Sequence, residues 1–226
     1  MKTIYTIDNG NTNPHVGIFK EGQLEKVVPL KDCQFNEANS EIILSSVGRD
    51  INLSGKNIFD VKNLRSEKNF LDMPVDYSPT LGMDRLACAY WVFKNHVKNE
   101  EKVLLIDAGT FTTYDLISKK GHEGGFIFPG LQTFLKTYAA GANLPILDLK
   151  NVNLRDEVNL PHSTEDAIGE AAKVYFQMTF QSILETFKPD LIITTGGEGK
   201  YFSEACFVPH LIHMALFEIR ETVNKL

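Results

Sequence analysis

The sequence has few cysteines and no long hydrophobic run. Its 226 residues include three cysteines, Cys33, Cys88 and Cys206, which are far apart and match no metal-ligand spacing. An odd number of isolated cysteines favours reduced thiols over a disulfide framework. No segment approaches the roughly 20 apolar residues that a membrane-spanning helix needs, and Asp8 interrupts the first apolar stretch too early for a secretion signal. We therefore expect a cytoplasmic protein that does not bind a membrane.

An excess of basic residues is missing as well. The chain has 23 lysines and arginines against 29 aspartates and glutamates, a net charge of −6. Sequence-independent binding of nucleic acid depends on an excess of positive charge, so this balance argues against a nucleic-acid partner. The hydrophobic content of 43% and the charged content of 23% are ordinary for a globular protein. The length allows one large domain or two smaller ones.

What the chain does contain is an internal repeat. The stretch "YTIDNGNTNPHVGIFKEGQ" resembles "LLIDAGTFTTYDLISKKGH" further along: each has an apolar strand, an Asp-x-Gly turn followed by threonine, and a second apolar strand. Asp8 precedes Gly22 by 14 positions, and Asp107 precedes Gly121 by 14 positions. Such agreement favours two related halves over a chance similarity. Each half would then present an aspartate-bearing turn to one cleft.

The spacing of apolar residues predicts a mixed-sheet α/β architecture. Strands are expected near residues 3–8, 15–20, 24–29, 41–47, 102–107, 112–118, 124–128 and 190–197. Helices are expected at residues 83–98, after Pro129-Gly130, from Ser163 to about Phe187, and from about residue 209 onward. The polar stretch at 96–102 suggests a boundary, which gives an N-terminal half at 1–98 and a C-terminal half at 99–226.

Glycines and carboxylates at strand ends predict a cleft that handles phosphate. In Asp8-Asn9-Gly10-Asn11-Thr12, glycine allows close backbone approach, amides and a hydroxyl can hold phosphate oxygens, and Asp8 can bind a cation or its water shell. The turn from Asp107 to Thr110 offers the same chemistry. Gly196-Gly197 end a third strand, where an adenosine can lie without side-chain collisions. One such turn alone is more often structural, but three together favour a phosphate site.

Two further motifs each allow two interpretations. In Gly82-Met83-Asp84-Arg85, at a predicted helix start, the carboxylate can accept a hydroxyl proton and the guanidinium can fix an anion. The alternative is an acid favoured by the helix dipole next to a surface arginine. The stretch "GGFIFPG" at residues 124–130 is either a strand followed by a Pro-Gly helix entry or a wall where two backbones, or a backbone and a substrate, approach closely.

Taken together, these motifs resemble type III pantothenate kinases. The matching segments occur in the family's order, at Asp8–Thr12, Gly82–Arg85, Asp107–Thr110, Gly124–Gly130, Ala142–Pro145, Ser163–Ala171 and Thr194–Gly197. The resemblance covers nearly the whole chain. It implies the duplicated ribonuclease H-like fold of the acetate and sugar kinase/heat-shock ATPase/actin superfamily, with two mixed-sheet halves around a central cleft.

The resemblance also implies an activity, which is the ATP-dependent phosphorylation of pantothenate to 4'-phosphopantothenate. This is the first step of coenzyme A biosynthesis, and family members perform it as homodimers with Mg²⁺ and a monovalent cation, K⁺ or NH₄⁺. Two alternatives stay open. One is a kinase for another small hydroxylated acceptor. The other is a nucleotide-binding accessory or regulatory protein of the same fold without kinase activity.

Site residues follow from the resemblance by position. Asp84 would be the proton acceptor, Asp107 would bind the monovalent cation, and Asp8 would lie near the magnesium. The substrate-binding residues would be Gly82, Met83, Asp84, Arg85, Thr164 and Tyr77. The ATP-binding residues would be Asp8, Asn9, Gly10, Asn11, Thr12, Asn13, Pro14, His15 and Thr110.

Two residues depart from the family pattern. Pro14 removes one backbone donor from the first turn. Phe111 stands directly after Thr110, where the family usually has alanine, and its ring would either narrow the nucleotide site or pack beneath it. Both departures concern the affinity for ATP, and they are the features that favour the accessory-protein alternative.

Overall fold

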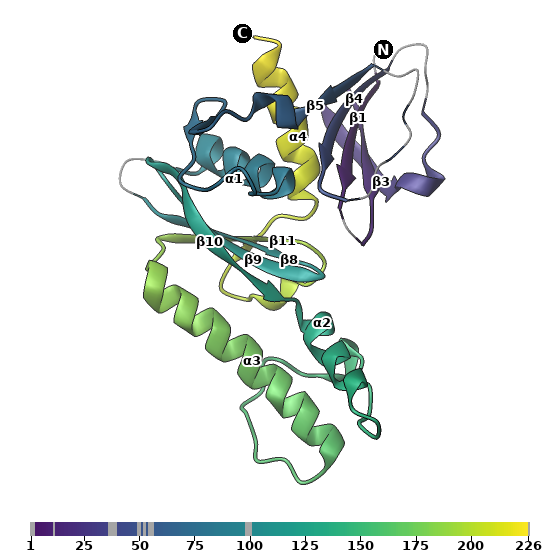
Figure 1. Ribbon diagram of the computed structural model, residues 1–226, viewed down its shortest axis with the longest axis vertical. Helices are drawn as coiled ribbons and strands as arrows, with labels where there is room; N and C mark the ends of the chain where they lie inside the picture. Colours follow the sequence, from purple (N-terminus) through teal and green to yellow (C-terminus); the bar gives the residue numbers. More distant parts are fainter. Residues whose placement is uncertain are drawn as a thin grey trace. The chain divides into compact units, whose positions relative to one another are not determined.

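Two five-stranded sheets carry the fold (Figure 1). The computed structural model describes residues 3–10, 12–35, 40–48, 51, 53, 57–97 and 101–225. The chain forms two compact units. The first comprises Met1–Glu101, Ile117–Gly124 and Val208–Leu226, and the second comprises Lys102–Leu116 and Gly125–Phe207. The halves expected from the sequence repeat, 1–98 and 99–226, are divided differently from these compact units, and they stay a prediction.

The first sheet has the strand order β3-β2-β1-β4-β5. Its strands are β1 (Thr3–Asn9), β2 (His15–Lys20), β3 (Gln23–Pro29), β4 (Ser40–Ser46) and β5 (Ile58–Asp60). β1 pairs antiparallel with β2 and parallel with β4, and β4 pairs parallel with β5. The sheet is therefore mixed, as the sequence predicted.

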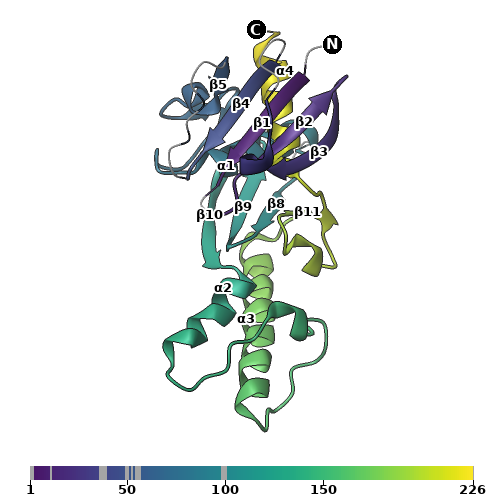
Figure 2. The same cartoon turned by 90° about the vertical axis from the view of Figure 1, so that its right-hand side faces the viewer.

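The second sheet repeats this order with the strands of the second half, β10-β9-β8-β11-β12 (Figure 2). Its strands are β8 (Val103–Ala108), β9 (Phe111–Ser118), β10 (Gly121–Pro129), β11 (Leu191–Thr195) and β12 (Cys206–Phe207). β8 pairs parallel with β11, and β11 pairs parallel with β12. The central strands β1 and β8 are those that carry the repeated Asp-x-Gly turns. The equal order of the two sheets confirms the duplicated fold.

Strand alternation decides which side chains of the first sheet face its helices. Ile7 and Val16 belong to an apolar cluster with Tyr5 and Ile42. The other face of β1 is covered by α4 (Leu211–Val223), whose Phe217 stacks on Phe19 of β2 at a ring-centroid distance of 4.4 Å. Helix α1 (Met83–Asn95) packs beside α4 (Figure 1).

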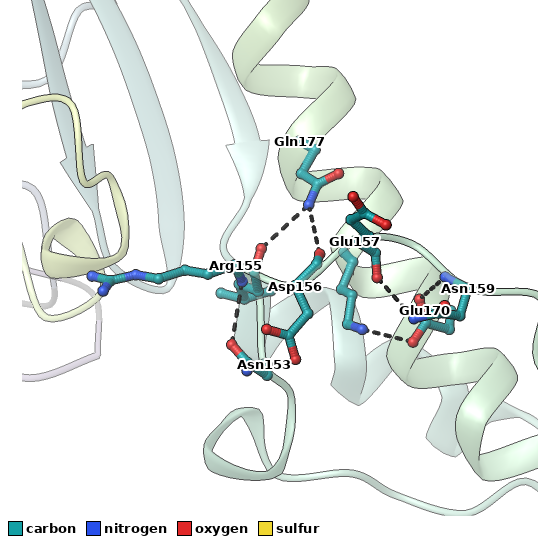
Figure 3. Close-up of polar contacts among 9 residues, drawn as sticks. Asn153, Arg155, Asp156, Glu157, Asn159, Glu170 and Gln177 are labelled. Carbon is teal, nitrogen blue, oxygen red and sulfur yellow. Dashed lines mark hydrogen bonds and ion pairs between the residues drawn. The ribbon is translucent and has the colours of Figure 1, made fainter.

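Helix α3 (Thr164–Phe187) packs against the second sheet. Ser163 caps it, because the Ser163 hydroxyl accepts a hydrogen bond from the Asp166 amide at 3.1 Å. This confirms the capping start that the sequence predicted. Figure 3 shows hydrogen bonds between α3 and the segment that precedes it. The Gln177 side-chain amide donates to the Leu154 carbonyl at 3.3 Å, and the Glu170 carboxylate accepts from the backbone amide of Asn159 at 2.9 Å.

The remaining elements are short. They are the strands β6 (Asn69–Phe70) and β7 (Met73–Pro74), helix α2 (Leu131–Lys136), and 3₁₀ turns at Leu30–Asp32, Val61–Leu64, Thr137–Ala140, Leu149–Asn151 and Gly199–Tyr201. The sequence did not predict β5, β6, β7 or β12, because two or three residues are too few to show a period. Within the described ranges, no helix has both the length and the apolar character needed to cross a membrane.

Candidate active site

The first turn joins β1 to β2 and places a carboxylate opposite an imidazole. Asp8 and His15 are cross-strand partners, and the distance from His15 Nε2 to Asp8 Oδ2 is 3.6 Å. Thr12 and Asn13 are exposed, whereas Pro14 and His15 are half-buried. Asn11, which the sequence assigned to ATP, lies outside the described residues. The described part of this turn therefore offers a carboxylate and a hydroxyl close to solvent.

The segment that follows β4 closes onto the same turn. The amides of Val47 and Gly48 both donate to the Asn9 carbonyl, at 3.2 and 2.8 Å. The Asn9 side chain is buried and donates to the Ser46 hydroxyl at 2.7 Å. A Cβ atom on Gly48 would lie 2.6 Å from the Gly10 carbonyl oxygen, so this position requires glycine. Sequence reasoning missed Gly48, whose only signal was a glycine just after an apolar strand.

The Gly82–Arg85 motif lies beside this turn, within the same unit. A Cβ atom on Gly82 would be 3.4 Å from Val47 Cγ1, and the Val47 backbone is bonded to Asn9. Asp84 lies in the first turn of α1, where its Oδ1 accepts from the Arg85 amide at 2.8 Å. The structure thus brings Asp84 near the phosphate-type turn that contains Asp8.

Arg85 is not the surface arginine of the alternative interpretation. It is only 8% exposed, and its guanidinium carbon lies 5.5 Å from the centre of the Tyr77 ring. Tyr77 also contacts the buried His122 ring edge-on at 5.9 Å, and its carbonyl accepts from Arg65 Nη2 at 2.9 Å. A cation over an aromatic face is a favourable contact. Tyr77, which the sequence assigned to the substrate, is therefore held beside Arg85.

The second turn, from β8 to β9, is built in the same way as the first. Gly196 has a positive φ of 82°, and a Cβ atom on it would lie 2.7 Å from Asp107 Oδ1. The Glu198 amide donates to the Ala108 carbonyl at 2.9 Å. The segment after β11 thus packs against Asp107 and Ala108, as the segment after β4 packs against Asn9 and Gly10. The side chain of Thr110 is exposed next to it.

The start of α2 is tied to this second turn. Glu198 accepts from the amides of Leu131 and Gln132 at 2.9 and 3.1 Å, which satisfies two donors at the helix start. The Gly130 amide donates to the Thr110 carbonyl at 3.0 Å. The "GGFIFPG" stretch is therefore a strand followed by a capped helix entry, and two backbones also approach closely there, because a Cβ atom on Gly130 would collide with the Gly109 carbonyl oxygen. Glu198 is a second residue that sequence reasoning missed, and its position after paired glycines was the only signal.

Two further residues of the second unit are exposed. Thr164, expected to reach the substrate, is the first residue of α3. Phe111 is 54% exposed, so its ring does not pack beneath the turn. Of the two roles that the sequence left open for Phe111, burial beneath the turn is wrong.

The carboxylates suit cations that are shared with a substrate. Among the residues that the structure describes, no group of three or more histidine, cysteine or acidic side chains could hold a metal ion by itself. Mg²⁺ in kinases is commonly bound by one or two carboxylates together with substrate phosphates. Asp8, half-buried beside Gly10, fits that donor set. Asp107 is half-buried and lies against the backbone of Gly196.

Solved structures show to which fold class the chain belongs. A Sinorhizobium meliloti protein provisionally described as a 2-dehydro-3-deoxygalactonokinase has a TM-score of 0.61 at 11% identity, over 99% of this chain and 96% of that one. A Campylobacter jejuni protein provisionally described as a Baf family transcriptional activator has a TM-score of 0.67 at 22% identity, over 98% of this chain and 100% of that one. The chain therefore shares the duplicated α/β fold of these two proteins.

Sequence comparison then shows the family. The model of the type III pantothenate kinase family matches residues 4–183. The type III pantothenate kinase of Aquifex aeolicus is 31% identical, with 93% of this chain and 94% of the relative covered. That of Helicobacter pylori is 28% identical, with 94% of this chain and 86% of the relative covered. This chain belongs to the type III pantothenate kinase family.

Proposed function

We propose that this protein transfers the γ-phosphoryl group of ATP to the primary hydroxyl of pantothenate. The product, 4'-phosphopantothenate, is the first intermediate on the way to coenzyme A. The observation that carries the proposal is that two motifs of the first unit both lie against Val47. The Asp8 turn and the Gly82–Asp84 helix start lie on either side of Val47, so a phosphate-type turn lies beside a carboxylate that can accept a proton.

The acceptor side consists of residues at the start of α1. Asp84 accepts the proton of the attacking hydroxyl, and its carboxylate is held by the Arg85 amide at 2.8 Å. Gly82 and Met83 would bind the substrate beside Asp84, and a side chain on Gly82 would collide with the Asp84 carboxylate. The buried guanidinium of Arg85, beside Tyr77, attracts the carboxylate of pantothenate.

The roles on the nucleotide side are carried over from the family by position. Residues from Asp8 to His15, and Thr110, would contact the phosphates of ATP, Asp8 would hold the divalent cation and Asp107 would hold the monovalent one. These ions would supply positive charge that neutralises the phosphate oxygens. Phosphoryl transfer depends mostly on alignment and charge neutralisation, which explains why the chain needs one general base and otherwise residues that position the reactants.

A homodimer is part of the proposal. In the second unit, α3 carries the exposed Met178, 68% accessible, and the segment before it carries Leu160, 82% accessible. Exposed apolar side chains can form part of an interface between proteins. Thr164, exposed at the start of the same helix, would reach the substrate of the partner subunit.

The activity is tested by incubating the protein with Mg·ATP and pantothenate in potassium and in sodium buffer. We expect ADP and 4'-phosphopantothenate to form in equal amounts, with faster turnover in potassium and no ADP without pantothenate. A panel of other small hydroxylated acceptors is run in parallel. Product from another acceptor but none from pantothenate would identify a different kinase.

The exposed ring of Phe111 beside Thr110 favours a second candidate, a nucleotide-binding accessory protein without kinase activity. Calorimetry separates the two candidates. ATP binding without phosphorylation of any acceptor would support the accessory protein and contradict the kinase.

A further inference from the structure

A continuous chain of polar contacts connects the Asp8 turn to the interior of the first unit. Thr6 Oγ1 lies 2.8 Å from His213 Nδ1, and His213 Nε2 lies 3.0 Å from His15 Nδ1. His15 Nε2 in turn faces Asp8 Oδ2 at 3.6 Å. His213 belongs to α4 and is fully buried. We call Thr6, His213, His15 and Asp8 the histidine relay.

The sheet is built to accommodate the His213 ring. Gly17 is the cross-strand partner of Thr6, and a Cβ atom on it would lie 2.6 Å from Thr6 Oγ1 and 2.7 Å from His213 Cγ. Glycine at this position therefore leaves the space that the imidazole fills. A buried imidazole is costly unless both ring nitrogens are hydrogen-bonded, and the relay supplies a partner for each.

Which ring nitrogens carry a proton determines which atom donates and which accepts in each hydrogen bond of the relay. Burial, together with the neighbouring histidines His15 and His210, lowers the pKa of His213 to about 3. A neutral imidazole has one nitrogen that donates and one that accepts.

Only one arrangement of these donors suits the carboxylate. If the Thr6 hydroxyl donates to His213 Nδ1, then His213 Nε2–H donates to His15 Nδ1, and His15 Nε2–H faces Asp8. The reverse arrangement directs a lone pair of His15 at a carboxylate oxygen, which is repulsive. The Thr6 hydroxyl also has the Gly17 carbonyl within reach, at 3.4 Å, so this hydroxyl alone does not fix the tautomers. The Asp8 carboxylate facing His15 Nε2 is what favours Nε2–H on both rings.

We propose that His213 is a positioning residue of the nucleotide site, which acts through His15 to hold the Asp8 carboxylate in place for Mg·ATP. The proposal rests on the proposed function of the Asp8 turn. Residues that orient a metal-binding side chain without touching the metal typically contribute about 10- to 100-fold to metal affinity or activity. His213 would be such a residue, supplied by a helix near the other end of the chain.

Three variants and a control test this role. His213→Leu removes both hydrogen bonds, and Gly17→Ala displaces the ring. His213→Gln keeps a donor where Nε2–H was. The control, Ile219→Ala, truncates another fully buried side chain of α4 that lies outside the relay. Melting temperatures show whether each variant is folded.

We expect His213→Leu and Gly17→Ala to raise the Kd for Mg·ATP about tenfold, while kcat at saturating ATP stays within about twofold. His213→Gln should recover most of the affinity, and Ile219→Ala should lower the melting temperature without changing the Kd. An unchanged Kd in folded His213→Leu, or an equal change in the control, would overturn the proposal.

The ring tautomers give a readout that does not depend on activity. Nitrogen NMR of the wild-type imidazoles should show the Nε2–H tautomer for His15 and His213, and His15 should lose this preference in His213→Leu. An Nδ1–H tautomer for His15 in the wild type would overturn the relay. If the wild type binds Mg·ATP but phosphorylates nothing, the proposed kinase fails while the relay stands.

Discussion

The two Asp-x-Gly turns share one architecture but have different surroundings. Each ends the central strand of a five-stranded sheet, and each is closed by a glycine that follows the neighbouring parallel strand. The Asp8 carboxylate faces the His15 imidazole, whereas the Asp107 carboxylate lies against the backbone of Gly196. The topology supplies two carboxylates with different neighbours, and under the proposed function these neighbours would fit them to different ions.

The two helices that follow the last strand of each sheet, α1 after β5 and α4 after β12, also differ in their first turns. Helix α1 has Asp84 in its first turn, whereas α4 has no acidic residue there and begins after His210, at a positive φ of 57°. A general base is needed once per reaction. In the proposed function Asp84 of α1 is this base, whereas the counterpart α4 supplies His213 to the interior.

The strongest test of this asymmetry is Asp84→Asn. Because the amide cannot accept the hydroxyl proton, we expect kcat to fall by about 10²- to 10⁴-fold, with little change in the Kd for ATP. Steady-state kinetics and calorimetry measure the two quantities. Asp32→Asn, which changes an exposed carboxylate of the same unit, serves as the control. Near-full turnover of Asp84→Asn would remove the proposed base.

The closing glycines can be compared by alanine substitution. Gly196→Ala combines a backbone collision with a positive φ, Gly48→Ala tests the collision, and Gly22→Ala tests a positive φ of 80° with open space around it. A left-handed conformation costs an ordinary residue about 1–2 kcal/mol, so we expect Gly196→Ala to lose the most stability. Urea unfolding measures all three. A loss for Gly196→Ala no larger than that for Gly22→Ala would contradict the close approach to Asp107.

The two carboxylates should respond to different ions. We expect Asp8→Asn to raise the Mg²⁺ concentration for half-maximal activity by about tenfold, or about 1.4 kcal/mol, and to leave the potassium response intact. Asp107→Asn should abolish the response to potassium at a similar Mg²⁺ requirement. Titrations of each ion at a fixed level of the other measure both. If both variants changed the response to the same ion, the two turns would not be specialised.

The smallest expected effect is that of Phe111→Ala. Because the ring is 54% exposed, its removal should change stability by no more than about 0.5 kcal/mol. If the ring narrows the nucleotide site, the Kd for ATP should fall by a few fold in calorimetry. An unchanged Kd would mean that the ring lies outside the site and that the second turn binds nucleotide without it.

Much of the fold could be predicted from local patterns. The strands β1, β2, β8 and β9 and the helix α3 were predicted to within a few residues, because a strand or helix of six or more residues shows its period in the sequence. The start of α3 at Ser163 was predicted because a cap depends on residues three positions apart. The short strands β5 and β12 have no such local signature.

The sequence by itself determined the duplication, the mixed-sheet class and the family. Each of these depends on motifs of a few neighbouring residues repeated in a recognisable order. The sequence also identified the candidate carboxylates Asp8, Asp84 and Asp107, because each follows a strand or starts a helix within a glycine-containing motif.

Only the tertiary structure decided what surrounds those carboxylates. His213 reaches Thr6 across 207 positions of the chain and His15 across 198, and no local pattern encodes such a contact. The same holds for three further residues. The contacts of Gly48, Glu198 and the buried Arg85 are with backbone and side chains that only folding brings close. Periodicity predicts an element, but the partners of a side chain depend on how the elements pack.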